Sequence, residues 1–180
     1  MEIKGYKGFS KGLMNRHGEG IHFEVGKVMS VEGPLKFGPY DLGGNGYSFC
    51  SNLEDVLRYY SPREEEVEIA EVTAIGEVAE GYDDQNDYYD MYAARNLRVD
   101  RVLTREEIVE MGLNLPPTFK APRFIQGFVL TPEEIKRFKE RFKKEQNVLD
   151  FIAYYQEGDT EVFNRREAEL NYPRPYQKVR

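Results

Sequence analysis

Hydrophobic and polar positions alternate with a period of two over much of the first half of the chain. This alternation is typical of half-buried strands, and β-branched residues strengthen it in the two later segments. Glycine and proline separate the segments and predict turns between them. The strand-like segments are residues 2–9, 21–25, 27–31, 47–50, 67–78 and 97–102.

The strand over residues 47–50 runs directly into a predicted helix. Ser51 with Glu54 three positions later forms a capping-box pattern, so Ser51 is the expected N-cap. The helix is expected to continue through Tyr60, before Pro62. Its apolar residues recur at helical spacing, namely Leu53, Val56, Leu57 and Tyr60.

Two further helix starts follow. Thr104 with Glu107 is a second capping box, opening a helix through Met111. Thr131, with a proline in the first turn, caps a predicted long helix over residues 131–157. The apolar stripe of this long helix is Ile135, Phe138, Phe142, Leu149 and Ile152.

These elements predict an α+β fold. We expect a twisted, mostly antiparallel sheet with capped helices against it, plus a long C-terminal helix packed on that core. The expected organisation is a core domain over residues 1–112, a proline-containing linker or crossing segment over 113–130, the helix over 131–157, and a polar, poorly ordered tail over 158–180.

Composition narrows the class of protein. The chain has 180 residues, 32% of them charged, and no apolar run as long as a membrane span. The first residues show no apolar signal region, so we expect a cytoplasmic protein without membrane contact. One cysteine, Cys50, and two histidines, His17 and His22, predict no metal site. Cys50 and His22 are interpreted as structural, although Cys50 adjoins a helix start, where a thiolate would be stabilised.

Charge is distributed unevenly along the chain, although the net charge is only −7. Eleven acids and no Lys or Arg lie between Glu64 and Asp90, which predicts an acidic surface that binds a protein partner. A solvated loop and a Ca²⁺ site are the alternatives for this stretch. The residues predicted to bind the partner are Asp83, Asp84, Asp87 and Asp90.

A later helix is rich in basic residues. It could contact nucleic acid or an acidic partner, dock against the acidic stretch, or simply be solvated. The acidic net charge disfavours nucleic acid as a partner, because phosphate binding requires clustered Lys and Arg. The basic residues are Lys136, Arg137, Lys139, Arg141, Lys143 and Lys144.

The N-terminal block resembles a domain of unknown function found in phage and prophage proteins. The resemblance covers roughly residues 3–105 and rests on Tyr-Lys-Gly-Phe at 6–9, Phe-Glu-Val-Gly-Lys at 23–27, and a Gly-aromatic strand at 46–60 that contains Cys-x-Asn and Asp-Val-Leu-x-Tyr-Tyr. A Val-rich strand with a glycine follows. The family usually has a histidine before the cysteine, whereas Tyr-Ser-Phe stands at 47–49, so any role of that histidine is lost. The resemblance implies a phage setting and no established activity.

The same block is similar, more loosely, to ADP-ribosyltransferases. By position, Tyr6, Lys7 and Gly8 correspond to the first motif, Tyr47 to the second and Glu107 to the third. Lys7 stands where those enzymes have His or Arg. The resemblance implies NAD as cofactor, bound by Tyr6, Gly8 and Tyr47, with Lys7, Tyr47 and Glu107 in catalysis. There the carboxylate would stabilise an oxocarbenium-like transition state. An inactive relative of that fold is the other possibility.

The sequence therefore favours a phage-type accessory protein without a cofactor that binds a host or phage macromolecule, with its acidic surface as the candidate binding site. The alternative is an ADP-ribosyltransferase-like enzyme that uses NAD. Both hypotheses stay open at this point, and so does the question of enzymatic activity.

Overall fold

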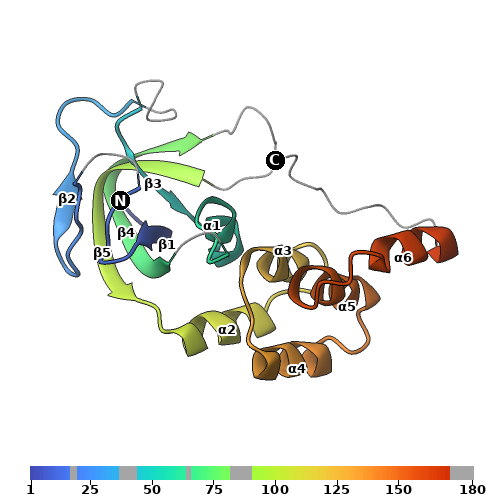
Figure 1. Cartoon of the computed structure of the whole chain (residues 1–180). Helices are drawn as coiled ribbons and strands as arrows, with labels where there is room; N and C mark the ends of the chain where they lie inside the picture. Colours follow the sequence, from blue (N-terminus) through green and yellow to red (C-terminus); the bar gives the residue numbers. More distant parts are fainter. Residues whose placement is uncertain (17–19, 37–43, 64–65, 82–90, 171–180) are drawn as a thin grey trace. The chain divides into compact units, whose positions relative to one another are not determined.

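The structure is a computed structural model that describes residues 1–16, 20–36, 44–63, 66–81 and 91–170. The chain divides into two compact units, Met1–Ile108 and Val109–Arg180. The first unit holds the strands and the second is helical (Figure 1). The predicted α+β class is confirmed.

A five-stranded sheet forms the first unit, and its pairings close into a ring. β1 pairs with β4, β4 with β5, β5 with β3, and β3 with β1, all antiparallel; β2 pairs with β5 alone. β4 and β5 are the longest strands and curve strongly (Figure 1). The strands are β1 (Glu2–Ser10), β2 (Val28–Ser30), β3 (Tyr47–Cys50), β4 (Val67–Gly81) and β5 (Met91–Val102).

A bulge in β4 lies where this strand stops pairing with β1 and continues to pair with β5. The register with β5 shifts between Ile75 and Val78, and Gly76 lies there with φ +82°, a conformation that glycine adopts without strain. Gly76 N–H donates to the Met1 carbonyl, where the β1 ladder ends. The bulge therefore bends β4 where it leaves β1 and continues along β5.

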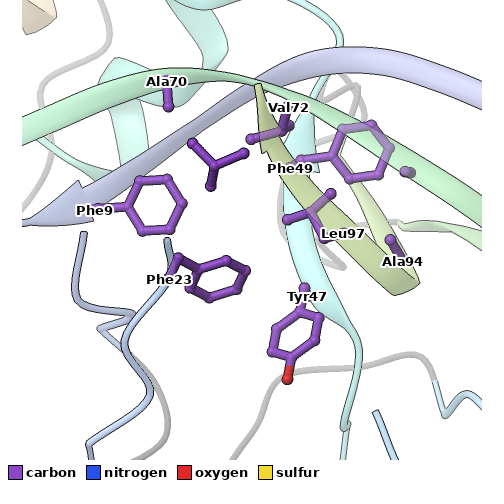
Figure 2. Packing of buried hydrophobic residues seen from close by; sticks show 10 residues of the cluster. Phe9, Phe23, Tyr47, Phe49, Ala70, Val72, Ala94 and Leu97 are labelled. Atoms are coloured by element: carbon purple, nitrogen blue, oxygen red, sulfur yellow. The ribbon is translucent and has the colours of Figure 1, made fainter. Parts of the chain in front are cut away.

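An apolar core lies on the inner face of this ring. Phe9 contacts Phe23, and Phe23 meets Tyr47 edge-on, with 5.2 Å between ring centroids in both pairs. Figure 2 shows these rings beside the small and branched residues of β4 and β5. The cluster is Phe9, Phe23, Tyr47, Phe49, Ala70, Val72, Ala74, Ala94, Leu97 and Val99.

The strand expected over residues 21–25 is not formed, so that prediction was wrong. His22 and Val25 make only isolated bridges, to Met14 and Val99. Phe23 is fully buried in the core. Gly26, at φ +83°, turns the chain before β2. Burial of one aromatic ring thus decided the path of this segment.

α1 (Leu53–Tyr59) forms where the sequence predicts it, but the predicted cap is wrong. Asn52, extended at φ −117° and ψ 141°, is the N-cap and makes no side-chain cap hydrogen bond. Ser51 lies outside the helix, and Glu54 is buried instead of reaching back. The capping box fails here because α1 packs against the sheet, so tertiary contacts set its start.

α2 (Arg105–Leu113) begins with the predicted capping box. Glu107 N–H donates to Thr104 Oγ1 at 3.2 Å, and Thr104 N–H donates to Glu107 Oε2 at 2.8 Å. This helix crosses the boundary between the two units.

The second unit contains more helices than expected. Residues 113–130 include a helix where a linker was expected, and the expected polar tail contains another. These corrections follow from apolar faces on short segments: Phe124 and Ile125 are fully buried, and Val162 and Phe163 nearly so. The elements are α3 (Lys120–Gly127), α4 (Pro132–Arg141), α5 (Gln146–Phe151), the π-helical η2 (Ile152–Gln156) and α6 (Val162–Leu170).

The single long helix expected over 131–157 is divided into α4, α5 and η2. After α4 the chain turns at Phe142, and burial shifts from the expected Leu149 to Val148. Asn147 Nδ2 donates to the Pro117 and Thr118 carbonyls and so ties α5 to the start of α3. Packing against α3 therefore outweighs the continuity of the helix.

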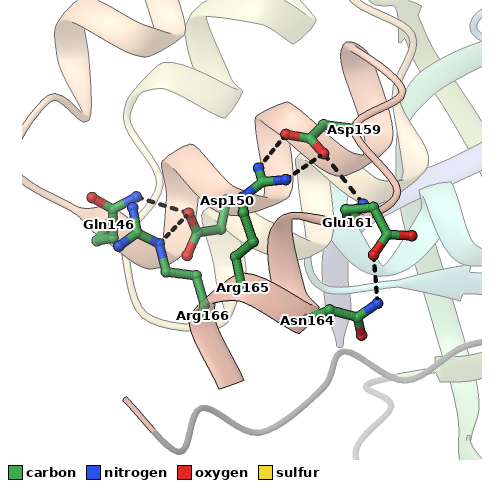
Figure 3. Close-up of polar contacts among 7 residues, drawn as sticks. All are labelled: Gln146, Asp150, Asp159, Glu161, Asn164, Arg165 and Arg166. Carbon is green, nitrogen blue, oxygen red and sulfur yellow. Dashed lines mark hydrogen bonds and ion pairs between the residues drawn. The ribbon is translucent and has the colours of Figure 1, made fainter. Parts of the chain in front are cut away.

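Figure 3 shows the polar contacts that hold α6. The buried Asp150 accepts from Gln146 Nε2 at 2.7 Å and from Arg166 Nε at 3.3 Å. Arg165 pairs with Asp159 just before α6 at 2.6 Å.

The Thr131 cap of α4 gives a first prediction. Thr131 Oγ1 accepts from Glu134 N–H while the Glu134 carboxylate accepts from Thr131 N–H. Thr131→Ala should cost about 1 kcal/mol of the free energy of unfolding, measured by denaturation followed by circular dichroism. The matched Ser51→Ala variant should stay within about 0.5 kcal/mol of wild type, because Ser51 caps nothing. Equal losses in the two variants would contradict this assignment.

Candidate functional site

The most unusual group in the first unit is the buried ammonium of Lys7. Lys7 lies in the middle of β1 and is 2% exposed. Its Nζ donates to the Ser48 carbonyl at 2.7 Å and reaches Ser48 Oγ at 3.4 Å. It also lies 5.4 Å from the centre of the Phe9 ring. Among the described ion pairs, none involves Lys7. A buried cation without a carboxylate partner is rare, because burial favours its neutral form.

Lys7 lies where two strands separate. β1 pairs with β4 along its whole length, but it meets β3 in register only at Tyr6 and Cys50. Beyond that pair, the Lys7 side chain connects β1 to the carbonyl of Ser48. We call this place, with Tyr6, Lys7, Ser48 and Cys50, the β1–β3 seam.

Burial changes the acid–base behaviour of Lys7. Loss of water lowers the pKa of Lys7 to about 8, and the nearby Cys50 acts in the opposite direction. The pKa of the amine is thus close to neutral pH, as it is in lysines that act as nucleophiles. In this structure the amine is enclosed by protein and donates to the Ser48 carbonyl of β3.

The residues of the NAD hypothesis lie on both sides of the sheet. Lys7 and Tyr47 are on the inner face, and Tyr47 packs in the core with its hydroxyl directed away from the cluster (Figure 2). Tyr6 and Gly8 alternate with Lys7 and face outward. A Cβ on Gly8 would lie 2.4 Å from the Tyr60 ring, so this glycine makes room for α1.

Glu107 lies on the outer side, in a network with Arg101. Arg101 Nη1 donates to Glu107 at 2.5 Å, and its Nε and Nη2 bind both oxygens of Glu71, at 2.8 and 3.0 Å. Glu71 is the cross-strand neighbour of Tyr6. Lys7, Tyr47 and Glu107 are therefore not brought to one face, and NAD binding by this set stays a prediction.

The outer network also affects protonation. Burial, followed by Glu71, raises the pKa of Tyr6. The Thr104 N–H and then Arg101 hold the pKa of Glu107 below its usual range. Because Arg101 is paired to both carboxylates, this network fixes the end of β5 to the start of α2.

Two buried carboxylates in α1 escaped the sequence analysis. Glu54 and Asp55 are each 3% exposed, although they stand in the first turn of an amphipathic helix. Asn52 Nδ2 donates to Asp55 at 3.1 Å. No signal in the sequence separates them from exposed acids of a first turn, because their burial depends on the contact of α1 with β1 and β3.

The predicted acidic partner-binding residues, Asp83, Asp84, Asp87 and Asp90, lie outside the described residues. They occur between Gly81 and Met91, which pair with each other at the ends of β4 and β5. The described flank carries Glu77, whose carboxylate is 3.6 Å from Arg95.

Four of the six basic residues predicted to lie on one helix pair with carboxylates of the second unit. Lys139 binds Glu157 at 2.7 Å and Arg137 binds Glu110. Arg141 lies over the Phe142 ring. The remaining pairs are Lys136 with Glu133 and Lys143 with Glu140. These contacts neutralise much of the positive charge of α4, and phosphate binding depends on clustered Lys and Arg.

The described part of the chain contains no group of three or more His, Cys, Asp or Glu side chains arranged to hold a metal ion. None of its helices is long and apolar enough to cross a bilayer.

Comparison with known proteins adds one finding. The model of a domain of unknown function, DUF7666, matches residues 3–111, which include β2 to β5 and all of β1 except its first residue. No curated protein and no solved structure matches the chain. Since the match covers more than half of the sequence, the chain belongs to the DUF7666 family.

Proposed function

We propose that this chain is a phage-type accessory protein of the bacterial cytoplasm that binds a basic protein of host or phage through the acidic connection between β4 and β5. The observation that carries the proposal is the pairing of Gly81 with Met91. It holds both ends of a nine-residue connection at one end of a long hairpin, and four of those residues are aspartates.

Charge density supports this choice of surface. Covalent connection keeps the four carboxylates within a few residues of the paired strand ends, so their potentials add. A surface of one sign accelerates encounter with an oppositely charged partner. Glu77 and Glu80 extend the acidic character along β4, and Arg95 pairs with Glu77.

Two features favour binding over catalysis. The inner face of the ring is filled by aromatic and aliphatic side chains, Phe9, Phe23 and Leu97 among them. On the outer face, Arg101 is paired with Glu71 and Glu107. A protein–protein role requires only a complementary surface, whereas catalysis requires a cavity with converging groups.

The test uses charge reversal at the acidic connection. The triple variant Asp83→Lys, Asp84→Lys and Asp87→Lys should bind a lysine-rich peptide at least tenfold more weakly than wild type, measured by titration at low salt. Wild-type binding should weaken steeply with added salt. The fold should persist, because exposed charges contribute little to stability.

A matched control separates local from total charge. Glu24→Lys, Glu133→Lys and Glu140→Lys change the net charge by the same amount at carboxylates that are at least 60% exposed. This control should retain most of the peptide affinity and most of the capture of proteins from bacterial lysate. If both triple variants lose binding equally, the acidic connection is not the site.

A further inference from the structure

The β1–β3 seam differs from every other strand contact in the first unit. β1 follows β4 from Glu2 to Ser10, and β3 follows β5 from Tyr47 to Cys50. Between β1 and β3 the register includes only Tyr6 and Cys50. The ring therefore closes through its shortest ladder.

Glycines on β1 leave this contact with few side chains. A Cβ on Gly5 would lie 2.5 Å from the Cys50 carbonyl oxygen, and a Cβ on Gly8 would lie 2.4 Å from the Tyr60 ring. Both positions are glycine because β3 and α1 approach the β1 backbone closely. The closed seam thus depends on the close approach of β3 and α1 to the backbone of β1.

Lys7 opposes this closure. Its ammonium is enclosed, with the Ser48 carbonyl and hydroxyl as its hydrogen-bond acceptors among the described residues, and burial lowers its pKa to about 8. Opening would return the charge to water, which favours the charged form. Local opening is expected where a structure has few ladder bonds and an unfavourable buried group.

We propose that the first unit opens locally at the β1–β3 seam, with β3 and α1 moving away from β1 while β3 stays paired to β5 and β1 stays paired to β4. Gly8 and Tyr60 form the closing contact, supported by Arg16, whose Nη1 donates to the Tyr59 carbonyl at 2.5 Å. Lys7 favours the open state.

Cys50 gives a direct measure of this motion. It is the only cysteine of the chain, it is 4% exposed, and it lies at the one register position of the seam. A thiol reagent can reach it only when β3 and α1 separate from β1. The rate of labelling of the native full chain therefore reports how often the seam opens.

The experiment compares labelling of Cys50 with amide exchange in β4 and β5. For wild type, the opening that exposes Cys50 to the reagent should have a smaller free energy than the opening that allows exchange of the β4 amides. The labelling rate should also depend less on denaturant concentration than the exchange rate does. Gly8→Ala, which displaces Tyr60, should accelerate labelling at least tenfold and leave β4 exchange within about twofold.

Gly112→Ala is the matched control. Its Cβ would lie 2.5 Å from the Phe124 ring in the second unit, a clash similar to that of Gly8→Ala. It should leave Cys50 labelling unchanged. The proposal is overturned if wild-type labelling has the same free energy and denaturant dependence as β4 exchange, or if Gly112→Ala accelerates labelling as much as Gly8→Ala.

Discussion

The Gln156→Leu variant is expected to lose about 3 kcal/mol of the free energy of unfolding of the second unit, since one side chain satisfies three backbone groups. Gln156 Nε2 donates to the Ile125 and Phe128 carbonyls, both at 2.6 Å, and its Oε1 accepts from Leu130 N–H at 3.0 Å. Leucine fills a similar volume but leaves all three groups without this partner.

The position of Gln156 also explains the π-helix η2. Gln156 ends η2, and the wider turn coincides with a side chain that reaches the end of α3. A π-turn often marks a position where local geometry serves a specific contact. Here that contact donates hydrogen bonds to carbonyls at the C-terminal end of α3.

Chemical denaturation followed by circular dichroism would measure this loss. Gln146→Leu is the control, because Gln146 makes one bond, to the Asp150 side chain, and should cost about 1 kcal/mol. A Gln156→Leu variant as stable as Gln146→Leu would show that water replaces the three backbone contacts.

The second large effect concerns Lys7 and pH. The folded pKa of about 8 lies below the ordinary value of 10.5 because burial disfavours the charged amine. Between these values the unfolded chain binds more protons, so stability rises with pH across this window. The cost of burying the charged Lys7 amine lowers stability in full below about pH 8 and disappears near pH 10.5. Its size is on the order of 3 kcal/mol.

The measurement compares wild type with Lys7→Met across pH 7–10.5. The stability of wild type relative to Lys7→Met should increase with pH over this range. Burial raises the pKa of Tyr6 and Tyr47, which lowers stability above about pH 10, but both tyrosines are present in each protein and their contributions cancel. A pH-independent difference between the two proteins would show that the Lys7 amine is hydrated in the folded state.

The sequence predicted elements well where local signals and packing agree. The Thr104–Glu107 and Thr131–Glu134 segments form helix starts whose capping hydrogen bonds are within reach of the local backbone. The strand over residues 47–50 has the same bounds in the structure. Ser51 fails as a cap because the position of α1 is set by the sheet beneath it.

Periodicity alone predicted one helix where the second unit has several. The stripe from Ile135 to Ile152 fits one continuous helix, yet the chain turns after Phe142. A hydrophobic stripe shows which residues will be buried but not which neighbour will cover them. The turn depends on α3, a helix the sequence analysis assigned to a linker.

The candidate site shows the same limit. Alternation along β1 places Lys7 and Tyr6 on opposite faces of the sheet, but nothing in the sequence pairs Lys7 with Ser48, forty-one positions away. Nor does it show that Glu71 and Glu107 share Arg101. Such pairs depend on strand register and on how the sheet closes.

The sequence by itself determined the α+β class, the positions of most strands, two helix caps and the concentration of acid between Glu64 and Asp90, because each depends on neighbours along the chain. Tertiary structure alone decided the closure of the ring, the burial of Lys7 and the division of the long helix. The physical reason is that burial and hydrogen bonding between distant segments outweigh local preferences of a fraction of a kcal/mol per residue.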